Sequence, residues 1–187
     1  YTIKVTGASG LDNVEGNSAK RDKNEILVTY HPETRSPDYG IAQCDRMLVA
    51  LDKYYRDGYD ITFCGVNNDP GSNEINAVIE KWQEEHQNAK SRQHLDHAQY
   101  ISAMQSAALV IGNSSAGIIE APWVGVPSVN IGRRQEGRPQ ANSVFEGVGE
   151  INDALHYQPS GWHPFYRGGA APKIAEVISR WLADGTR

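Results

Sequence analysis

Residues 112–117, with the sequence GNSSAG, place small and hydroxylated side chains directly after the apolar run Ala107–Ile111. The run predicts a buried strand, and the residues after it predict a short helix that reaches Glu120 and is stopped by Pro122. The start of a helix offers backbone N–H groups and the positive end of the helix dipole to an anion, and serine hydroxyls add donors. This segment therefore predicts a phosphate site.

Glu120 lies one to two turns into the predicted helix, where a carboxylate can accept two hydrogen bonds from a ribose diol. Together with Ser114 and Ser115 it indicates half of a nucleoside-diphosphate site. The residues alone also allow a plainer interpretation. The two serines suit a helix N-cap, and Glu120 suits an ordinary carboxylate favoured by the helix dipole.

Polar side chains also follow the other predicted strands. Strands are expected at residues 26–30, 60–66 and near 89–93, and each is followed at once by a polar residue: His31, Asn67 and His94. Ligands bind beyond the carboxyl ends of the strands in open α/β sheets. We therefore expect these side chains to converge with residues 112–115 on one edge of the sheet.

Strand and helix patterns alternate along the chain. Helical spacing of apolar residues predicts helices over 38–57, through 75–82, after the capping residue Asp96, and through 174–181, where Trp82 and Trp181 are expected in the core. Further strands are expected at 1–6, 126–131 and 143–148, and residues 7–25 read as loop with one turn. Continuously apolar strands that alternate with helices predict an α/β fold, with a parallel sheet covered by helices on both faces.

The composition excludes several classes of function. The 187 residues carry a net charge of -5, so we expect no nucleic-acid partner, and no apolar run approaches the roughly 20 residues that span a bilayer. Two separated cysteines, Cys44 and Cys64, predict buried reduced thiols in a cytoplasmic protein. His94 and His97 have helical spacing without further ligands, and nothing in the sequence demands a metal or a redox cofactor. The chain begins at Tyr1 without Met, which suggests a cut inside a longer protein.

Several motifs resemble the carboxy-terminal half of the UDP-N-acetylglucosamine 2-epimerase family, in the family's order and over nearly the whole chain. They are VTGASGLDNV, LVTYHPET, VNNDPGSN, VIGNSSAGIIEAP and VNIGRRQEGR. The HP that follows the strand at 26–30 is similar to the hydrolysing branch, which converts UDP-GlcNAc to N-acetylmannosamine plus UDP. The resemblance implies the second domain of a GT-B-type enzyme with two Rossmann-like domains. Residues 1–25 would then be the interdomain segment with the first strand and loop, and residues 26–187 the nucleotide-binding domain.

The resemblance also implies roles for single residues. One catalytic residue and five substrate-binding residues match the family's pattern: His31 as the functional histidine, and Asn67, Ser114, Ser115, Glu120 and Arg134 as ligands of the UDP-sugar. His94 falls near a nucleotide-facing position. The family places acidic catalytic groups on an amino-terminal domain that this chain lacks. We therefore expect weak UDP binding without turnover, and a homo-oligomer for the full-length protein.

Two alternatives remain open on the residues alone. The site also suits the donor-nucleotide half of a GT-B glycosyltransferase, or a nucleotide-sugar sensor that never meets a catalytic domain. His31 and the loop RQEGR at residues 134–138 favour the epimerase. Within that loop, Gln135 and Arg138 either hold the loop together or contact the ligand.

Overall fold

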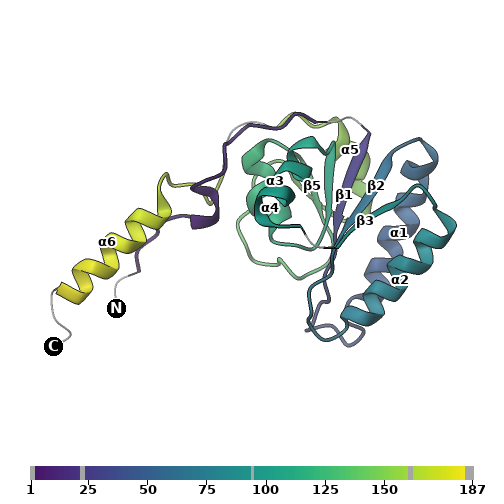
Figure 1. Cartoon of the computed structure of the whole chain (residues 1–187), viewed down its shortest axis with the longest axis horizontal. Coiled ribbons are helices and arrows are strands. Elements are labelled where there is room, and N and C mark those ends of the chain that lie inside the picture. The colour runs from purple at the N-terminus through teal and green to yellow at the C-terminus, as the bar shows by residue number, and fades with distance from the viewer. Residues whose placement is uncertain (1–2, 22–23, 94, 160–161, 184–187) are drawn as a thin grey trace.

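A six-stranded parallel sheet forms the centre of the molecule, in the order β3-β2-β1-β4-β5-β6 (Figure 1). The computed structural model describes residues 3–21, 24–93, 95–159 and 162–183. The strands are β1 (Glu25–Thr29), β2 (Asp60–Cys64), β3 (Lys90–Arg92), β4 (Leu109–Gly112), β5 (Ser128–Asn130) and β6 (Val144–Glu146). This is the strand order of a doubly wound Rossmann sheet, whose order reverses between β1 and β4. The predicted Rossmann-like fold is confirmed.

Helices cover both faces of the sheet. The helices are α1 (Ile41–Arg56), α2 (Ser72–Glu85), α3 (His97–Ser106), α4 (Ala116–Val124), α5 (Ile151–His156) and α6 (Ala170–Ala183), with 3-10 turns η1 (Ser9–Leu11) and η2 (Val148–Glu150). In β1, Ile26 and Val28 pack against α1, α2 and α5, whereas Leu27 packs against α3 and α4. This alternation follows from the pleat of a strand, which sends successive side chains to opposite faces.

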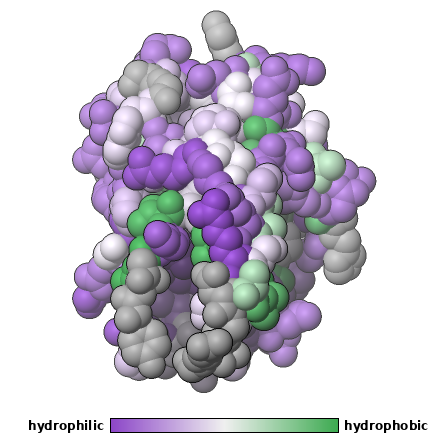
Figure 2. Space-filling model, turned by 90° about the vertical axis from the view of Figure 1, so that its left-hand side faces the viewer, coloured by the Kyte–Doolittle hydropathy of each residue, from purple (hydrophilic) through white to green (hydrophobic). Residues whose placement is uncertain are grey.

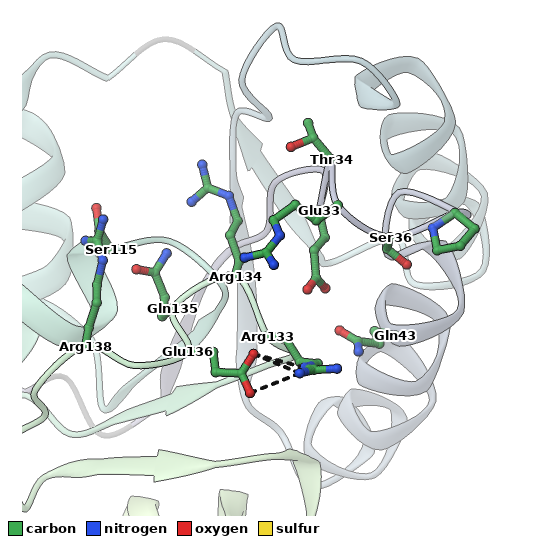
Figure 3. Close-up of a pocket in the computed structure, with 12 residues that line it drawn as sticks. Glu33, Thr34, Ser36, Gln43, Ser115, Arg133, Arg134, Gln135, Glu136 and Arg138 are labelled. Atoms are coloured by element: carbon green, nitrogen blue, oxygen red, sulfur yellow. Dashed lines mark hydrogen bonds and ion pairs between the residues drawn. The ribbon is translucent and has the colours of Figure 1, made fainter.

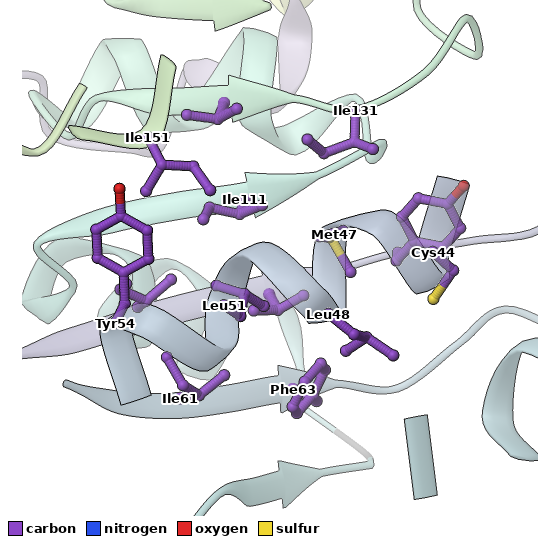
Figure 4. Close-up of a cluster of buried hydrophobic side chains, with 14 of the residues drawn as sticks. Cys44, Met47, Leu48, Leu51, Tyr54, Ile61, Phe63, Ile111, Ile131 and Ile151 are labelled. Carbon is purple, nitrogen blue, oxygen red and sulfur yellow. The ribbon is translucent and has the colours of Figure 1, made fainter. Parts of the chain in front are cut away.

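The larger core lies between the sheet and α1. Helix α1 turns Met47, Leu48 and Leu51 toward the sheet, where they meet Phe63 of β2 and Ile111 of β4 (Figure 4). Full burial of such a side chain stabilises the folded state by about 1.5–3 kcal/mol. This core fixes the carboxyl ends of β1 and β4, which carry the predicted site.

Two predicted boundaries are wrong. No strand forms over residues 3–6, because no neighbouring strand pairs with them, and Ile3 and Val5 are exposed; Tyr1 and Thr2 lie outside the described residues. Pro122 does not stop α4, which runs on to Val124. A proline removes only its own N–H, and Gly125 ends the helix three residues later in the left-handed conformation, at φ 89°.

Helix α6 projects away from the sheet, beside the N-terminal segment (Figure 1). Asp12 caps its first turn, accepting hydrogen bonds from the N–H groups of Ala170 (2.8 Å) and Ala171 (2.6 Å). Trp181 is 62% exposed, so the prediction that it belongs to the core is wrong. Trp82 does pack against the core, as predicted.

Both cysteines are buried and reduced, as predicted. Cys44 lies on α1 and Cys64 ends β2. Burial raises the pKa of the Cys44 thiol to about 12, and burial also raises the pKa of Cys64. Both thiols are therefore protonated at neutral pH and act as small core side chains.

Candidate functional site

The site begins where β1 and β4 end side by side. Thr29 pairs with Gly112 in the register of the two strands. Two residues beyond Thr29, the backbone N–H of His31 donates to Asn113 Oδ1, and Asn113 Nδ2 donates to the His31 carbonyl, each at 2.7 Å. Asn113 is fully buried. Its side chain therefore ties the two strand ends together at the point where the strand order reverses.

His31 is held as a neutral imidazole. Its Nδ1 accepts a hydrogen bond from the backbone N–H of Asn67 at 3.2 Å. Burial and, to a smaller extent, the positive charge of Arg134 lower the pKa of His31 to about 4, and Asp69 opposes the shift. Because Nδ1 accepts, the proton of the neutral ring sits on Nε2. His31 therefore presents a hydrogen-bond donor to the site near pH 7.

Asn67 contributes mainly through its backbone. Its side-chain Nδ2 turns to Asp69 Oδ2 at 2.5 Å, and its Oδ1 is buried without a hydrogen-bond partner among the described residues. The structure thus brings Asn67 to His31, as the convergence of strand ends predicts.

The start of α4 offers N–H groups that point out of the helix. Ser115 is the N-cap residue, and its side chain makes no capping hydrogen bond. Ser114 Oγ accepts from the N–H of Ala116 only at 3.4 Å. Within the described part of the chain, nothing accepts a hydrogen bond from the N–H of Ser115. The Ser114 hydroxyl is thus partly used by the helix start and by Tyr100, whereas the Ser115 hydroxyl and the Ser115 N–H remain available to an anion.

Glu120 lies on the α3 side of this point. Its Oε2 is buried and has no hydrogen-bond partner among the described residues, and burial raises the pKa of its carboxyl. Tyr100 lies nearby, with its hydroxyl 3.0 Å from Thr29 Oγ1. Tyr100 follows the predicted cap Asp96 on the apolar stripe of its helix, and no local pattern indicates that it reaches the site.

A pocket of about 580 Å³ lies on the other side of Ser115 (Figure 3). The loop after β1, the first turn of α1 and the loop after β5 surround it. It is lined by Glu33, Thr34, Arg35, Ser36, Pro37, Gln43, Ser115, Arg133, Arg134, Gln135, Glu136 and Arg138. Ser114 instead lines a tightly packed cavity with Thr29 and Gly117. The two serines thus face different sides of the site.

The loop after β5 folds back onto the end of β4. The Asn113 carbonyl accepts hydrogen bonds from Gln135 Nε2 at 2.8 Å and from Arg134 Nη1 at 3.4 Å. Gln135 therefore holds the loop in place, which is one of the two roles that the sequence left open. This contact also brings the Arg134 guanidinium to the strand end that carries Ser114 and Ser115.

The structure thus gathers His31, Asn67, Ser114, Ser115 and Arg134 around the ends of β1 and β4, with Glu120 one helical turn beyond. His94 lies outside the described residues. Over the ranges that the structure describes, no group of His, Cys, Asp or Glu side chains has the geometry to hold a metal ion. No helix among them has the length and apolar character needed to cross a membrane.

Comparison with known proteins agrees with the motifs. Residues 2–179 match the family model described as UDP-N-acetylglucosamine 2-epimerase. The GDP/UDP-N,N'-diacetylbacillosamine 2-epimerase (hydrolyzing) of Campylobacter jejuni is 34% identical over 135 residues, which cover 72% of this chain and 34% of that protein. The polysialic acid biosynthesis protein P7 of Escherichia coli is 32% identical over 130 residues, which cover 70% of this chain and 33% of that protein.

A solved structure shows the same fold. The UDP-GlcNAc 2-epimerase of Methanocaldococcus jannaschii, in complex with UDP-GlcNAc and UDP, superposes with a TM-score of 0.70 at 14% identity. The match covers 95% of this chain and 55% of that one. The chain spans about a third of the length of the two curated relatives above. On the extent of the family match, the chain belongs to the UDP-N-acetylglucosamine 2-epimerase family.

Proposed function

We propose that the chain is the UDP-binding domain of a hydrolysing UDP-N-acetylglucosamine 2-epimerase. The observation that carries the proposal is the position of the α4 N-terminus. Its unused N–H group and two serines lie at the reversal point of the sheet, between the buried carboxylate of Glu120 and the pocket beside Arg134. A nucleoside diphosphate needs a diol acceptor on one side and cationic donors on the other.

In this arrangement the ribose lies against Glu120 and the diphosphate against Ser115 and the N-terminus of α4, whereas Ser114 packs beside Thr29 and Gly117. The unpartnered Oε2 of Glu120 accepts a hydrogen bond from a ribose hydroxyl, which relieves the cost of leaving a buried oxygen without a donor. A UDP-sugar that runs from Glu120 past Ser115 extends toward Arg134, and its sugar then lies in the pocket beside Ser115.

The reaction proposed for the whole enzyme is anti-elimination followed by hydration. A base removes the C2 proton of the sugar, the C1–O bond breaks, and its electron pair leaves with the β-phosphate of UDP. Water then adds its hydroxyl to C1 of the glycal. C2 receives a proton on the face opposite the one from which its proton was removed, which gives N-acetylmannosamine. Arg134 and the α4 N-terminus stabilise the charge of the departing diphosphate.

His31 suits the role of a donor to that leaving group. Its Nε2 carries the proton in the neutral form, so the resting imidazole is not itself poised to remove the C2 proton. Approach of the diphosphate raises the pKa of His31 and offsets the effect of Arg134. The base for C2 then comes from elsewhere, in keeping with the family's acidic groups on an amino-terminal domain.

We also propose that the chain works as the second domain of a longer polypeptide, which forms a homo-oligomer. Two observations support this: the curated relatives are about three times as long as the matched segment, and α6 stands away from the sheet with an apolar stripe exposed. The exposed residues are Ile174, Val177, Ile178, Trp181 and Leu182. Figure 2, which views the molecule from the α6 end, shows such apolar side chains among polar ones.

Calorimetric titration with UDP and UMP tests the proposal. We expect saturable binding of UDP in the millimolar range, because the proposed first domain would supply the other half of the cleft. UMP should bind more weakly, because it lacks the second phosphate. Ser115→Ala and Glu120→Gln should each weaken UDP binding several-fold. The matched controls are the exposed residues Ser102→Ala and Glu84→Gln, which should not change it. Equal binding by all four variants would contradict the proposed site.

A further inference from the structure

The pocket beside Ser115 holds hydrogen-bond acceptors that have no donor. Glu33 is 9% exposed, and within the described residues no group donates a hydrogen bond or forms an ion pair with its carboxylate. Gln43 Oε1 and Gln135 Oε1 are buried and likewise have no partner there. The Glu33 carboxylate keeps contact with the open pocket, whereas the two amide oxygens are enclosed by protein atoms. Glu33 therefore offers an unpaired, accessible carboxylate to a ligand that brings a hydrogen-bond donor.

Two of these acceptors lie next to Gly132. A Cβ atom built on Gly132 would lie 1.9 Å from Gln43 Oε1 and 3.2 Å from Glu33 Oε2. Glu33 and Gln43 come from the loop after β1 and from α1, and their side chains lie near each other in Figure 3. Gln135 enters from the opposite loop, and its amide orientation is fixed because Nε2 donates to the Asn113 carbonyl. Its Oε1 is therefore an acceptor by geometry.

Cationic groups surround the same space. Arg35, Arg133, Arg134 and Arg138 all line the pocket, and of these Arg133 is paired with the exposed Glu136 at 3.0 Å. The ligand must thus carry anionic or carbonyl oxygens for the guanidinium groups and N–H or O–H donors for the acceptors. A hexose with an acylamino substituent, linked to a diphosphate, has all of these groups on neighbouring atoms.

We propose that Glu33 selects the sugar by accepting the N–H of an acylamino group. The inference rests on the proposed function, since it requires the diphosphate at Ser115 to direct the sugar into this pocket. Glu33 would then determine specificity for acylamino sugars, whereas Ser115 and Glu120 would bind the UDP moiety.

The test compares UDP, UDP-GlcNAc and UDP-glucose by ligand-detected NMR titration of the wild-type chain and Glu33→Gln. Glutamine keeps the size of the side chain but removes its charge. We expect UDP to bind within about twofold of wild type and UDP-GlcNAc to bind about tenfold more weakly, which corresponds to 1.4 kcal/mol. The preference for UDP-GlcNAc over UDP-glucose should shrink by a similar factor.

Glu84→Gln is the matched control, because Glu84 is exposed on α2 and lies outside the pocket lining. It should change none of the three affinities. Equal weakening of UDP and UDP-GlcNAc by Glu33→Gln, or no change in either, would overturn the inference while leaving the UDP site intact. Absence of UDP binding to the wild-type chain would instead overturn the proposed function, and the sugar assignment with it. Thermal unfolding of each variant separates these outcomes from loss of the fold.

Discussion

The Asn113 side chain forms two hydrogen bonds with the backbone of His31, one to its N–H and one from Nδ2 to its carbonyl, both at 2.7 Å. The two residues are 82 positions apart in the sequence. The pair joins the chain segments that leave the ends of β1 and β4. The position of the His31 ring therefore depends on a residue that directly precedes Ser114 and Ser115. Stability and ligand binding are therefore coupled at Asn113.

Replacing Asn113 should destabilise the fold. In Asn113→Ala the N–H and carbonyl of His31 lose their partners, and we expect unfolding to become easier by about 2–4 kcal/mol. Asn113→Asp keeps the acceptor for the His31 N–H but loses the donor to the His31 carbonyl. Its loss of stability should therefore depend on pH, because only a protonated carboxyl can donate. Urea unfolding followed by circular dichroism measures both. The control Asn152→Ala, at an exposed position of α5, should change stability by less than about 0.5 kcal/mol.

The pKa of His31 should respond to its two charged neighbours in opposite directions. Arg134→Gln removes a positive charge that disfavours the imidazolium, so the pKa should rise from about 4, though burial keeps it below 6.5. Asp69→Asn removes a negative charge and should lower the pKa further. Titration of the His31 ring resonances by NMR reads both shifts. Movement of both variants in the same direction would refute this electrostatic account.

Acid should weaken the fold through the same histidine. The pKa of His31 is about 4 in the folded chain and near 6.5 when unfolded, so between these values the unfolded state binds more protons. Stability should therefore fall as the pH drops from 6.5 to 4, by on the order of 2 kcal/mol for this group. His31→Gln should flatten the curve in part. A slope remains because burial also lowers the pKa of His163. An unchanged slope in His31→Gln would contradict the assignment.

The sequence predicts all six strands of the sheet, and it adds one over residues 1–6 that does not form over residues 3–6. The buried strands β1, β2 and β4 carry apolar residues that indicate them, whereas β3 is the exposed polar segment Lys90–Arg92. The sequence misses α5, since six residues with only Ile151 and Ala154 buried are too short to show a helical period. The position of Trp181 cannot follow from periodicity either. An amphipathic stripe predicts that a helix has an apolar face, but it does not predict which part of the protein, or which other protein, covers that face.

The site shows the same division. Ser115 and Glu120 carry a local pattern and are predicted from it. The roles of Asn113 and Gln135 come from contacts with backbone groups of distant residues, which no local pattern encodes. The position of Glu33 in the pocket likewise depends on contacts between distant segments, which no local pattern encodes.

Two glycines near the site should separate backbone conformation from steric contact. Gly112 has φ 139°, and a Cβ there would lie 2.0 Å from the Thr29 carbonyl oxygen, which the sheet holds in place. Gly137 has φ 81° but nothing within 4 Å of such a Cβ. Gly137→Ala should cost about 1–2 kcal/mol from the left-handed backbone alone, and Gly112→Ala a further 1–3 kcal/mol or more from the contact. Thermal unfolding of the two variants measures the difference, and equal costs would contradict it.

The exposed stripe of α6 should govern self-association and leave the fold of the chain untouched. Ile178 is 51% exposed and Trp181 is 62% exposed, so replacing both with serine removes apolar surface from water contact without opening a cavity. We expect the double variant to shift less than about 0.5 kcal/mol in unfolding free energy, and to sediment as a monomer at concentrations where the wild-type chain associates. Leu51→Ala, in the core under α1, should instead cost about 2–5 kcal/mol. If the serine variant loses as much stability as Leu51→Ala, α6 packs within its own chain, and the stripe is then not a surface for another domain.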